Sequence, residues 1–207
     1  MDGFLQAAGV KKVFNRRPIF DGIGFRVQQG ETLLITGRNG SGKSTLVKIL
    51  ADVLTPSAGE VVLTWGGGAV RERRHRYFGL VSPYLQLYDE FSAEENLSLA
   101  QRIRGLREEP AEADRLFALL GILHRKGDPV RTFSSGMKQR AKYAMALIHH
   151  PPILLLDEPM SNLDAEGMEA VRSLMHAQRT QGILVVATND LTDVDRYEHR
   201  IDLHGSR

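Results

Sequence analysis

The most informative stretch of the chain is Gly37-Arg38-Asn39-Gly40-Ser41-Gly42-Lys43-Ser44, which fits the pattern G-x-x-x-x-G-K-[S/T] without a deviation and is followed by Thr45. Glycines in this pattern permit positive φ and a close approach of the backbone to a phosphate, so that successive N–H groups point at its oxygens. The Lys43 ammonium is expected to reach the β- and γ-phosphates, and the Ser44 hydroxyl to bind Mg²⁺. A helix that begins near Lys43 would add its positive dipole end. The stretch therefore predicts a nucleoside triphosphate site at residues 37–45.

Strand and helix patterns alternate on both sides of this stretch. Residues 31–36 are a short apolar run that ends at glycine, as a buried strand would, and residues 43–53 carry apolar side chains at helical spacing. Near the end of the chain, strand, helix and strand patterns follow one another at residues 153–157, 165–179 and 182–188. Further strands are predicted at residues 5–14, 23–27, 61–64, 77–81 and 200–203. The alternation predicts an α/β fold with a mainly parallel sheet, helices on both faces and a small antiparallel β part.

The middle of the chain differs from its flanks, because helical spacing dominates it. Helices are predicted there at residues 93–104, 111–120 and 135–149. We therefore expect a single domain over residues 1–207. Residues 1–83 and 151–207 would form the α/β core, and residues 84–150 would form an inserted helical subdomain.

Composition restricts the classes of protein that remain. The 207 residues are 42% apolar and 25% charged, which is ordinary for a soluble globular protein. No run approaches the roughly 20 apolar residues needed to cross a bilayer, and the N-terminus does not resemble a secretory signal. The absence of cysteine excludes disulfides, thiolate catalysis and cysteine-based zinc sites. A formal net charge of +2 is too small to indicate a general polyanion binder, so we expect no nucleic acid partner.

A second motif places two acids at the end of an apolar run. Four apolar residues, 153–156, precede Asp157-Glu158-Pro159. In ATPases with such a phosphate loop, the Asp at this place holds Mg²⁺, and the adjacent Glu can orient and deprotonate the attacking water. The alternative is a solvated turn at the end of an ordinary strand, but an intact phosphate loop elsewhere in the chain favours the functional interpretation.

Several motifs together resemble those of ABC-type ATPases, and the resemblance extends over essentially the whole chain. The run Phe133-Ser134-Ser135-Gly136-Met137-Lys138-Gln139-Arg140 resembles that family's LSGGQ signature with its basic continuation. Asp157-Glu158-Pro159 follows about 20 residues later, as it does in the family, and Ser161-Asn162-Leu163-Asp164 resembles the family's D-loop. Phe14 stands where the family has an aromatic ring that stacks on adenine.

The resemblance implies an ATP-binding and ATP-hydrolysing subunit of a transporter, with ATP and Mg²⁺ as cofactors. ATP would bind at residues 37–45 and Phe14, with Mg²⁺ held by Ser44 and Asp157. Ser134, Ser135 and Gly136 would contact, in trans, the γ-phosphate held by a second copy or a related cassette. The partner would be an integral membrane permease, and the chain would lie on the cytoplasmic face of the membrane. Without the other motifs, the signature run would be interpreted only as the N-cap of a helix.

Two positions depart from the family's pattern. The family has a glutamine just after the strand predicted at residues 77–81, where this chain has Pro83 or Tyr84. Either Gln86 replaces it as a ligand for Mg²⁺ or that contact is lost. The family's histidine near the γ-phosphate is replaced by Asn189, whose amide can donate a hydrogen bond but cannot carry a positive charge. We therefore take Glu158, Lys43 and Asn189 as the candidate catalytic residues and expect slow hydrolysis.

Two further features and one other function stay open. The basic run at residues 71–76 is typical of a solvated loop, with a lipid or nucleic acid contact as the alternative. His149-His150 is more typical of a helix C-terminus than of a metal site. The alternative to a transporter subunit is a non-transport or catalytically weak nucleotide switch. The compact chain also resembles the ATP-binding subunits of haem exporters and of ABC-2-type exporters.

Overall fold

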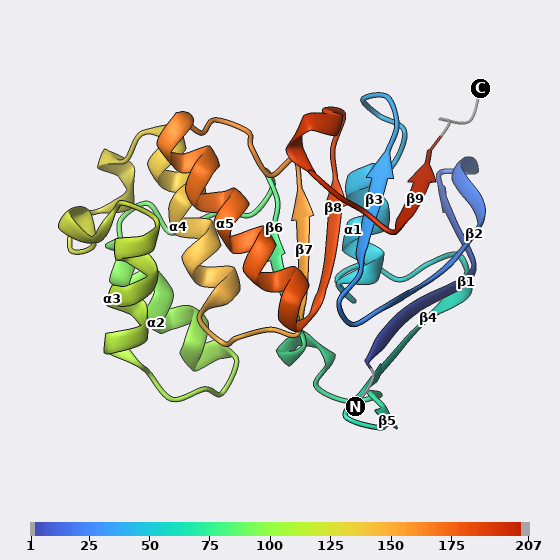
Figure 1. Ribbon diagram of the computed structural model, residues 1–207, viewed down its shortest axis with the longest axis horizontal. Coiled ribbons are helices and arrows are strands. Elements are labelled where there is room, and N and C mark those ends of the chain that lie inside the picture. Colours follow the sequence, from blue (N-terminus) through green and yellow to red (C-terminus); the bar gives the residue numbers. More distant parts are fainter. Residues whose placement is uncertain (1–2, 204–207) are drawn as a thin grey trace.

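The computed structural model describes residues 3–203, which form two sheets and the helices that pack against them (Figure 1). The larger sheet has five strands, all parallel, in the order β6-β7-β8-β3-β9. Its strands are β3 (Thr32–Thr36), β6 (Phe78–Val81), β7 (Ile153–Asp157), β8 (Ile183–Ala187) and β9 (His199–Asp202). The smaller sheet is antiparallel, in the order β2-β1-β4-β5. The predicted α/β class, with a mainly parallel sheet and a small antiparallel part, is confirmed.

The three central strands of the parallel sheet are buried at every residue, because helices cover both faces. Leu154, Leu156 and Val186 pack into a core shared with the helices on the α5 side of the sheet. Their neighbours along the strands, such as Leu155 and Val185, pack into a second core shared with α1 and the antiparallel sheet. In Figure 1, α5 (Ala165–Gln181) lies in front of the sheet and α1 (Lys43–Leu50) behind it.

The antiparallel sheet begins with a long hairpin. Its strands are β1 (Phe4–Phe14), β2 (Arg17–Gln28), β4 (Ala58–Trp65) and β5 (Gly68–Ala69). Asn15 and Arg16 alone form the turn between β1 and β2, and both have positive φ, at 47° and 65°. Two such residues suit the twist of a tight hairpin. The turn is therefore two residues long, and β2 starts at Arg17, well before residue 23, where the sequence pattern predicted the strand.

The segment between β6 and β7 is helical, as predicted. Its α-helices are α2 (Ala93–Ile103), α3 (Pro110–Leu119) and α4 (Ser135–Leu147), with short 3₁₀ turns η2 (Leu123–Arg125) and η3 (Val130–Thr132). Two further 3₁₀ turns are η1 (Arg74–Arg76), before β6, and η4 (Leu191–Asp193), after β8. Within residues 3–203, no helix combines the length and the apolar character needed to cross a membrane.

Two helices end earlier than their sequence pattern predicts. The predicted helix 43–53 stops at Leu50, and the predicted helix 135–149 stops at Leu147. Asp52 and His150, which follow the two ends, have positive φ of 63° and 47°. A helix cannot continue through left-handed backbone, so these residues end the helices before the prolines and glycines that follow them.

Candidate functional site

The phosphate loop lies between the carboxyl end of β3 and the start of α1. Gly37, Gly40 and Gly42 have positive φ of 147°, 79° and 102°. A Cβ atom on Gly42 would lie 2.5 Å from Ile19 Cγ2, and one on Gly37 would collide with the Leu203 carbonyl oxygen. Both the backbone conformation and the packing therefore require glycine at Gly37 and Gly42. The loop leads directly into the N-terminus of α1, where the free N–H groups of a helix favour an anion.

Lys43 is the centre of a polar cluster, and its side chain is only 6% exposed. Its Nζ donates to the Gly37 carbonyl oxygen at 2.9 Å and to Asn189 Oδ1 at 2.6 Å, and it lies 3.4 Å from Glu158 Oε1. The Asn189 amide nitrogen in turn donates to Asn39 Oδ1. The three predicted catalytic residues come from α1 and from the ends of β7 and β8, and the fold brings them together.

Glu158 follows β7 in an uncommon backbone conformation. Its φ is 50°, in the left-handed region that non-glycine residues rarely adopt. The Glu158 N–H donates to the Ala187 carbonyl oxygen at 2.8 Å, which holds the residue against the end of β8. Backbone of this kind costs about 1–3 kcal/mol and is concentrated at functional sites. Here it turns the Glu158 carboxylate toward Lys43 instead of letting the strand continue.

Asp157 is 1% exposed, and its two carboxylate oxygens have different surroundings. Oδ2 accepts a hydrogen bond from Ser82 Oγ at 3.1 Å. Oδ1 is buried and has no hydrogen-bond partner within residues 3–203. A buried carboxylate oxygen without a partner is costly, and a hard divalent cation satisfies such an oxygen. The donor set therefore fits Mg²⁺, with Asp157 and the half-buried Ser44 supplying the protein's oxygens.

An open cleft runs beside these residues. The described residues that line it are Phe14, Ile19, Asn39, Gly40, Gly42, Lys43, Ser44, Thr45, Pro83, Tyr84 and Glu158. The Phe14 ring is 44% exposed, with Lys12 Nζ 4.8 Å from its centroid. A nucleotide base bound in the cleft could stack on a face of the Phe14 ring.

The predicted alternative ligand Gln86 is exposed and is not among the residues that line the cleft. Pro83 and Tyr84 occupy that wall instead, and Lys48 Nζ lies 4.4 Å from the centroid of the Tyr84 ring. The sequence pattern indicated Tyr84 only as a replacement for glutamine, and it gave no sign that Ser82 is a partner of Asp157. An acid paired with a serine 75 residues away gives no local signal.

The signature run lies at the start of α4. Ser134 is the N-cap of α4, and its Oγ accepts a hydrogen bond from the Met137 N–H at 3.2 Å. Ser135 is exposed. A Cβ atom on Gly136 would lie 2.8 Å from the Asn162 carbonyl oxygen, so glycine lets α4 pack closely on the turn that follows β7. Ser134, Ser135 and Gly136 are not among the residues that line the cleft, so this chain does not bring them to its own phosphate loop.

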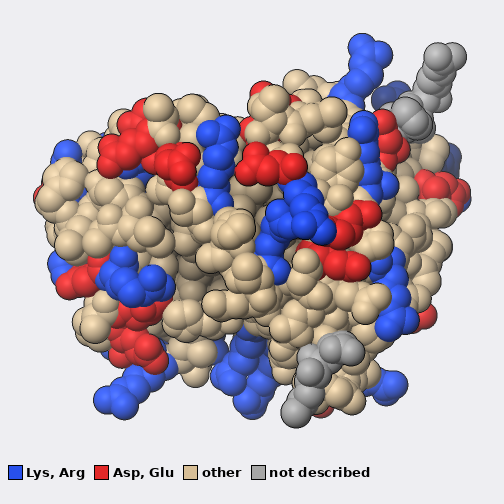
Figure 2. Space-filling view, viewed as in Figure 1, with Lys and Arg blue, Asp and Glu red and all other residues tan. Residues whose placement is uncertain are grey.

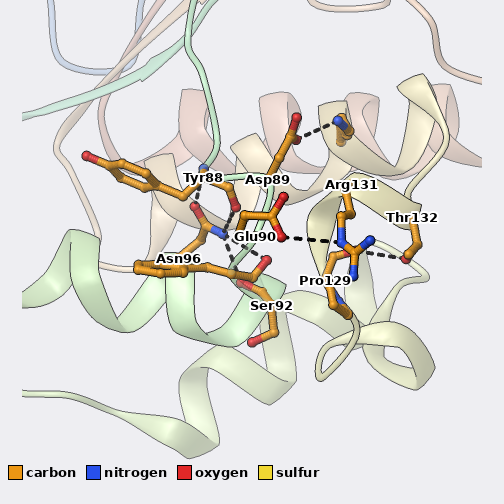
Figure 3. A network of polar contacts seen from close by, with 10 residues as sticks. Tyr88, Asp89, Glu90, Ser92, Asn96, Pro129, Arg131 and Thr132 are labelled. Carbon is orange, nitrogen blue, oxygen red and sulfur yellow. Dashed lines mark hydrogen bonds and ion pairs between the residues drawn. The ribbon is translucent and has the colours of Figure 1, made fainter.

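A polar network connects the segment after β6 to the helices (Figure 3). Asn96 Oδ1 accepts from the Tyr88 N–H at 2.8 Å, and its amide nitrogen donates to the carbonyl oxygens of Tyr88 and Ser92 at 3.0 and 2.9 Å. Lys138, on α4, pairs with Asp89 at 2.7 Å. The segment that begins at the cleft wall is therefore fastened both to α2 and to the helix that carries the signature run.

Several known proteins and one family model match the sequence of this chain. A family model described as ABC transporter matches residues 20–161. The cytochrome c biogenesis ATP-binding export protein CcmA of Rhodopseudomonas palustris (strain BisB5) is 35% identical over 89% of this chain and 90% of that protein. The linearmycin resistance ATP-binding protein LnrL of Bacillus subtilis (strain 168) is 30% identical over 89% of this chain. The bacitracin transport ATP-binding protein BcrA of Bacillus licheniformis is 28% identical over 95%. The chain spans only 60% of LnrL and 65% of BcrA.

Solved structures show the same fold. The ATP-binding subunit of an ABC transporter superposes with a TM-score of 0.84 at 28% identity, covering 97% of this chain and 86% of that one. A putative ABC transporter ATP-binding protein from Pyrococcus furiosus, 20% identical, covers 97% of this chain and 98% of its own with a TM-score of 0.81, which supports the fold alone. The matched family model covers well over half of the chain and includes the phosphate loop, the signature run and Asp157-Glu158. The chain therefore belongs to the ABC transporter family.

Proposed function

We propose that this chain binds and hydrolyses ATP to power a transporter, closing on a second cassette when ATP binds and opening after hydrolysis. The observation that carries the proposal is that Glu158 and Asn189 both contact Lys43, which lines the cleft, beside a buried Asp157 oxygen without a partner among residues 3–203. Such a cleft places a cation, a base and a metal ligand around one phosphate chain.

Each residue has a chemical role in this proposal. Glu158 takes a proton from water as the water oxygen bonds to the γ-phosphorus, and the bond from that phosphorus to the β–γ bridging oxygen breaks to release ADP. Lys43 stabilises charge on the phosphate oxygens, and Phe14 stacks on adenine. Ser44 and Asp157 would hold Mg²⁺, which neutralises phosphate charge when it is bound.

A second copy, or a related cassette, would complete the site. Ser134 and Gly136 lie at the N-terminus of α4, where hydroxyl and N–H groups favour an anion, yet they do not line this chain's own cleft. They would therefore contact a triphosphate bound to the partner. In this proposal, ATP binds the closed pair more tightly than the open one. ATP binding therefore shifts the population toward the closed pair.

The transporter's membrane part would be a separate permease. A groove lined by Val53, Leu85 and Met145 lies between α1, α4 and the segment after β6, and it suits a helix of that partner. The chain would then lie on the cytoplasmic face of the membrane. In this proposal, residues 84–150 form a helical subdomain that transmits motion to the permease. Residues 1–83 and 151–207 form the catalytic core. The relatives are named for different cargoes, so cargo would be set by the permease.

The decisive experiment replaces Glu158 by glutamine. We expect Glu158→Gln to lower ATP turnover by about 10²–10⁴-fold, because the base is lost, while ATP binding remains. With ATP and Mg²⁺, the variant should migrate as a stable dimer in size-exclusion chromatography with light scattering. Glu169→Gln, an exposed position on α5, is the matched control and should keep native turnover. An undiminished rate in Glu158→Gln would remove the proposed mechanism.

A catalytically weak nucleotide switch is the second candidate, and Asn189 is the observation that favours it. The Asn189 side chain accepts a hydrogen bond from Lys43 and donates one to Asn39. The Asn189 amide itself carries no charge. A switch would bind ATP and dimerise without measurable turnover in the native chain. Turnover that disappears in Glu158→Gln would rule the switch out.

A further inference from the structure

The basic run at residues 71–76 has no role in the nucleotide site. It lies between β5 and β6, and Arg71, Arg73 and His75 are exposed. Lys and Arg side chains project from the lower edge of the molecule in Figure 2, at the end of the sheet opposite the phosphate loop.

Contacts fix the run against the end of α2. The Arg76 guanidinium donates to the carbonyl oxygens of Arg104 and Gly105, at 3.4 and 3.5 Å. These carbonyls are at the C-terminus of α2, where a cation is favoured. The Arg74 guanidinium donates to the Val61 carbonyl oxygen at 3.2 Å. Two arginines of the run therefore act as anchors, and Arg76 fixes the run against the segment after α2 that leads to Arg107.

We define the arginine patch as Arg71, Arg73 and Arg107 together with Ile103. None of these three arginines has an ion-pair partner within the described part of the chain, residues 3–203. Two nearby acids, Asp52 and Glu108, are paired with Arg74 and Arg102. Glu72 is the one exposed acid within the run itself. Glu109, two residues after Arg107, is also exposed. The three arginines of the patch still outnumber these two neighbouring acids, Glu72 and Glu109, so net positive charge remains.

An exposed apolar side chain accompanies this charge. Ile103 is 73% exposed, the most exposed large apolar side chain among residues 3–203, and it lies one residue before Arg104. Val53, which is 65% exposed, lines one groove together with His75 and Arg104. Unpaired arginines beside exposed aliphatic side chains are typical of surfaces that meet an anionic bilayer. A site for single-stranded nucleic acid would instead present aromatic rings for stacking, and the patch has none.

We infer that the arginine patch binds the headgroups of anionic phospholipids while Ile103 inserts at the interface. The inference rests on the proposed membrane location for its biological setting. The groove proposed for the permease is lined by His75 and Arg104, so the patch adjoins the surface that would face the bilayer. Lipid binding itself requires neither the permease nor ATP.

The test is flotation of the full chain with vesicles. We expect the chain to float with vesicles made of equal parts of phosphatidylglycerol and phosphatidylcholine, and not with pure phosphatidylcholine. Binding should weaken as salt rises, because exposed charges are screened. The double variant Arg71→Gln/Arg73→Gln should lose roughly 30-fold in apparent affinity, since each arginine near an anionic surface contributes about fivefold. Ile103→Ser should lose several-fold.

The matched control is Arg16→Gln/Arg17→Gln, which removes the same charge at the hairpin between β1 and β2, at the other end of the molecule (Figure 1). It should float as the native chain does. All these variants should keep native ATP turnover, so that loss of vesicle binding and failure of the proposed function are separate results.

Three outcomes would overturn the inference. The native chain could fail to float with anionic vesicles, or the Arg71→Gln/Arg73→Gln variant could float as well as the control. Alternatively, the patch could bind a single-stranded RNA oligonucleotide in a manner that depends on Arg71 and Arg73, without binding vesicles. That third result would assign the surface to nucleic acid.

Discussion

At position 189 this chain has an uncharged asparagine, where the family pattern has a histidine that can carry positive charge near the γ-phosphate. Asn189 Oδ1 accepts from Lys43, and its amide nitrogen donates to Asn39, so both ends of the amide hold protein groups. An uncharged amide stabilises a developing phosphate charge less than an imidazolium does. Hydrolysis is therefore expected to be slow with Asn189 and faster with a histidine.

The corresponding prediction is that Asn189→His raises the rate of ATP turnover by roughly tenfold, because protonated imidazole adds a positive charge near the γ-phosphate. The measurement is steady-state phosphate release at saturating ATP and Mg²⁺. Asn189→Ala, which removes both contacts, should be slower than the native chain. An Asn189→His variant no faster than Asn189→Ala would show that this position does not limit hydrolysis.

A buried hydroxyl holds the turn that follows Glu158, the proposed catalytic base. Tyr143 on α4 is fully buried, and its hydroxyl donates to the Pro159 carbonyl oxygen at 2.9 Å. Burial raises the pKa of this hydroxyl far above its usual value, so it remains a donor. Removing it leaves the carbonyl without a partner, and we expect Tyr143→Phe to cost about 1–2 kcal/mol in the free energy of unfolding. Tyr197→Phe, at a partly exposed site, should cost less than about 0.5 kcal/mol in the same denaturant titration. Equal losses would show that the hydrogen bond contributes nothing.

At the scale of elements, the start of α2 is fixed by a reciprocal cap. The Ser92 side chain accepts from the Glu95 N–H at 3.1 Å, and the Glu95 carboxylate accepts from the Ser92 N–H at 2.7 Å. Ser92→Ala should therefore lower the free energy of unfolding by about 1 kcal/mol. Ser173→Ala, at an exposed position inside α5, should not destabilise the chain. Urea denaturation curves compare the two, and an undiminished midpoint in Ser92→Ala would contradict the expected role of the cap.

The packing of α4 on the turn after β7 depends on Gly136. Alanine normally stabilises a helix by about 1 kcal/mol relative to glycine, but its Cβ here would lie 2.8 Å from the Asn162 carbonyl oxygen. Overpacking costs about 1–3 kcal/mol, so crowding should outweigh helix propensity.

We therefore expect Gly136→Ala to destabilise the chain, whereas Gly127→Ala, whose nearest neighbour would be 4.0 Å away, should not. Thermal unfolding of both variants decides between crowding and propensity. A higher melting temperature for Gly136→Ala would mean that propensity prevails and that α4 moves away from the turn.

At the scale of the whole molecule, His149 couples stability to pH. Burial, followed by the nearby positive charge of Arg104, lowers the pKa of His149 to about 4. Its Nε2 lies 3.1 Å from the Phe78 carbonyl oxygen. The unfolded chain binds a proton at this histidine below about pH 6.5, and the folded chain does so only below about pH 4. The contribution of His149 to the free energy of unfolding is therefore fully present above pH 6.5, and it decreases as the pH is lowered toward 4.

We expect the native chain to lose about 1 kcal/mol more per pH unit in that window than His149→Gln, which has no group to protonate. The measurement is the free energy of unfolding in urea at several pH values between 4 and 7. His176→Gln removes an exposed histidine and should keep the native slope. Parallel pH profiles for the native chain and His149→Gln would show that burial of His149 does not control acid sensitivity.

Much of the site could be predicted from residues that are neighbours in the chain. The phosphate loop needs only consecutive residues with glycines at positions of positive φ, and the β7 strand with its two acids needs only a buried apolar run. Alternating patterns were likewise sufficient for the α/β class, because the periods of strands and helices depend on the backbone. The N-cap of α4 was predictable for the same reason, because Ser134 bonds to the Met137 N–H only three residues away.

Contacts between distant segments gave no such signal. Ser82 and Asp157 are 75 residues apart, so only folding of the parallel sheet brings them to one edge. For Lys43 and Asn189, 146 residues apart, the family resemblance predicted a common site, but their direct hydrogen bond depends on the fold. The early ends of α1 and α4 depend on left-handed backbone at Asp52 and His150. The contact of Arg76 with the end of α2 joins residues 28 apart and likewise gives no local signal. Local chemistry is determined by sequence neighbours, whereas the partners, burial and accessibility of each group depend on how the elements pack.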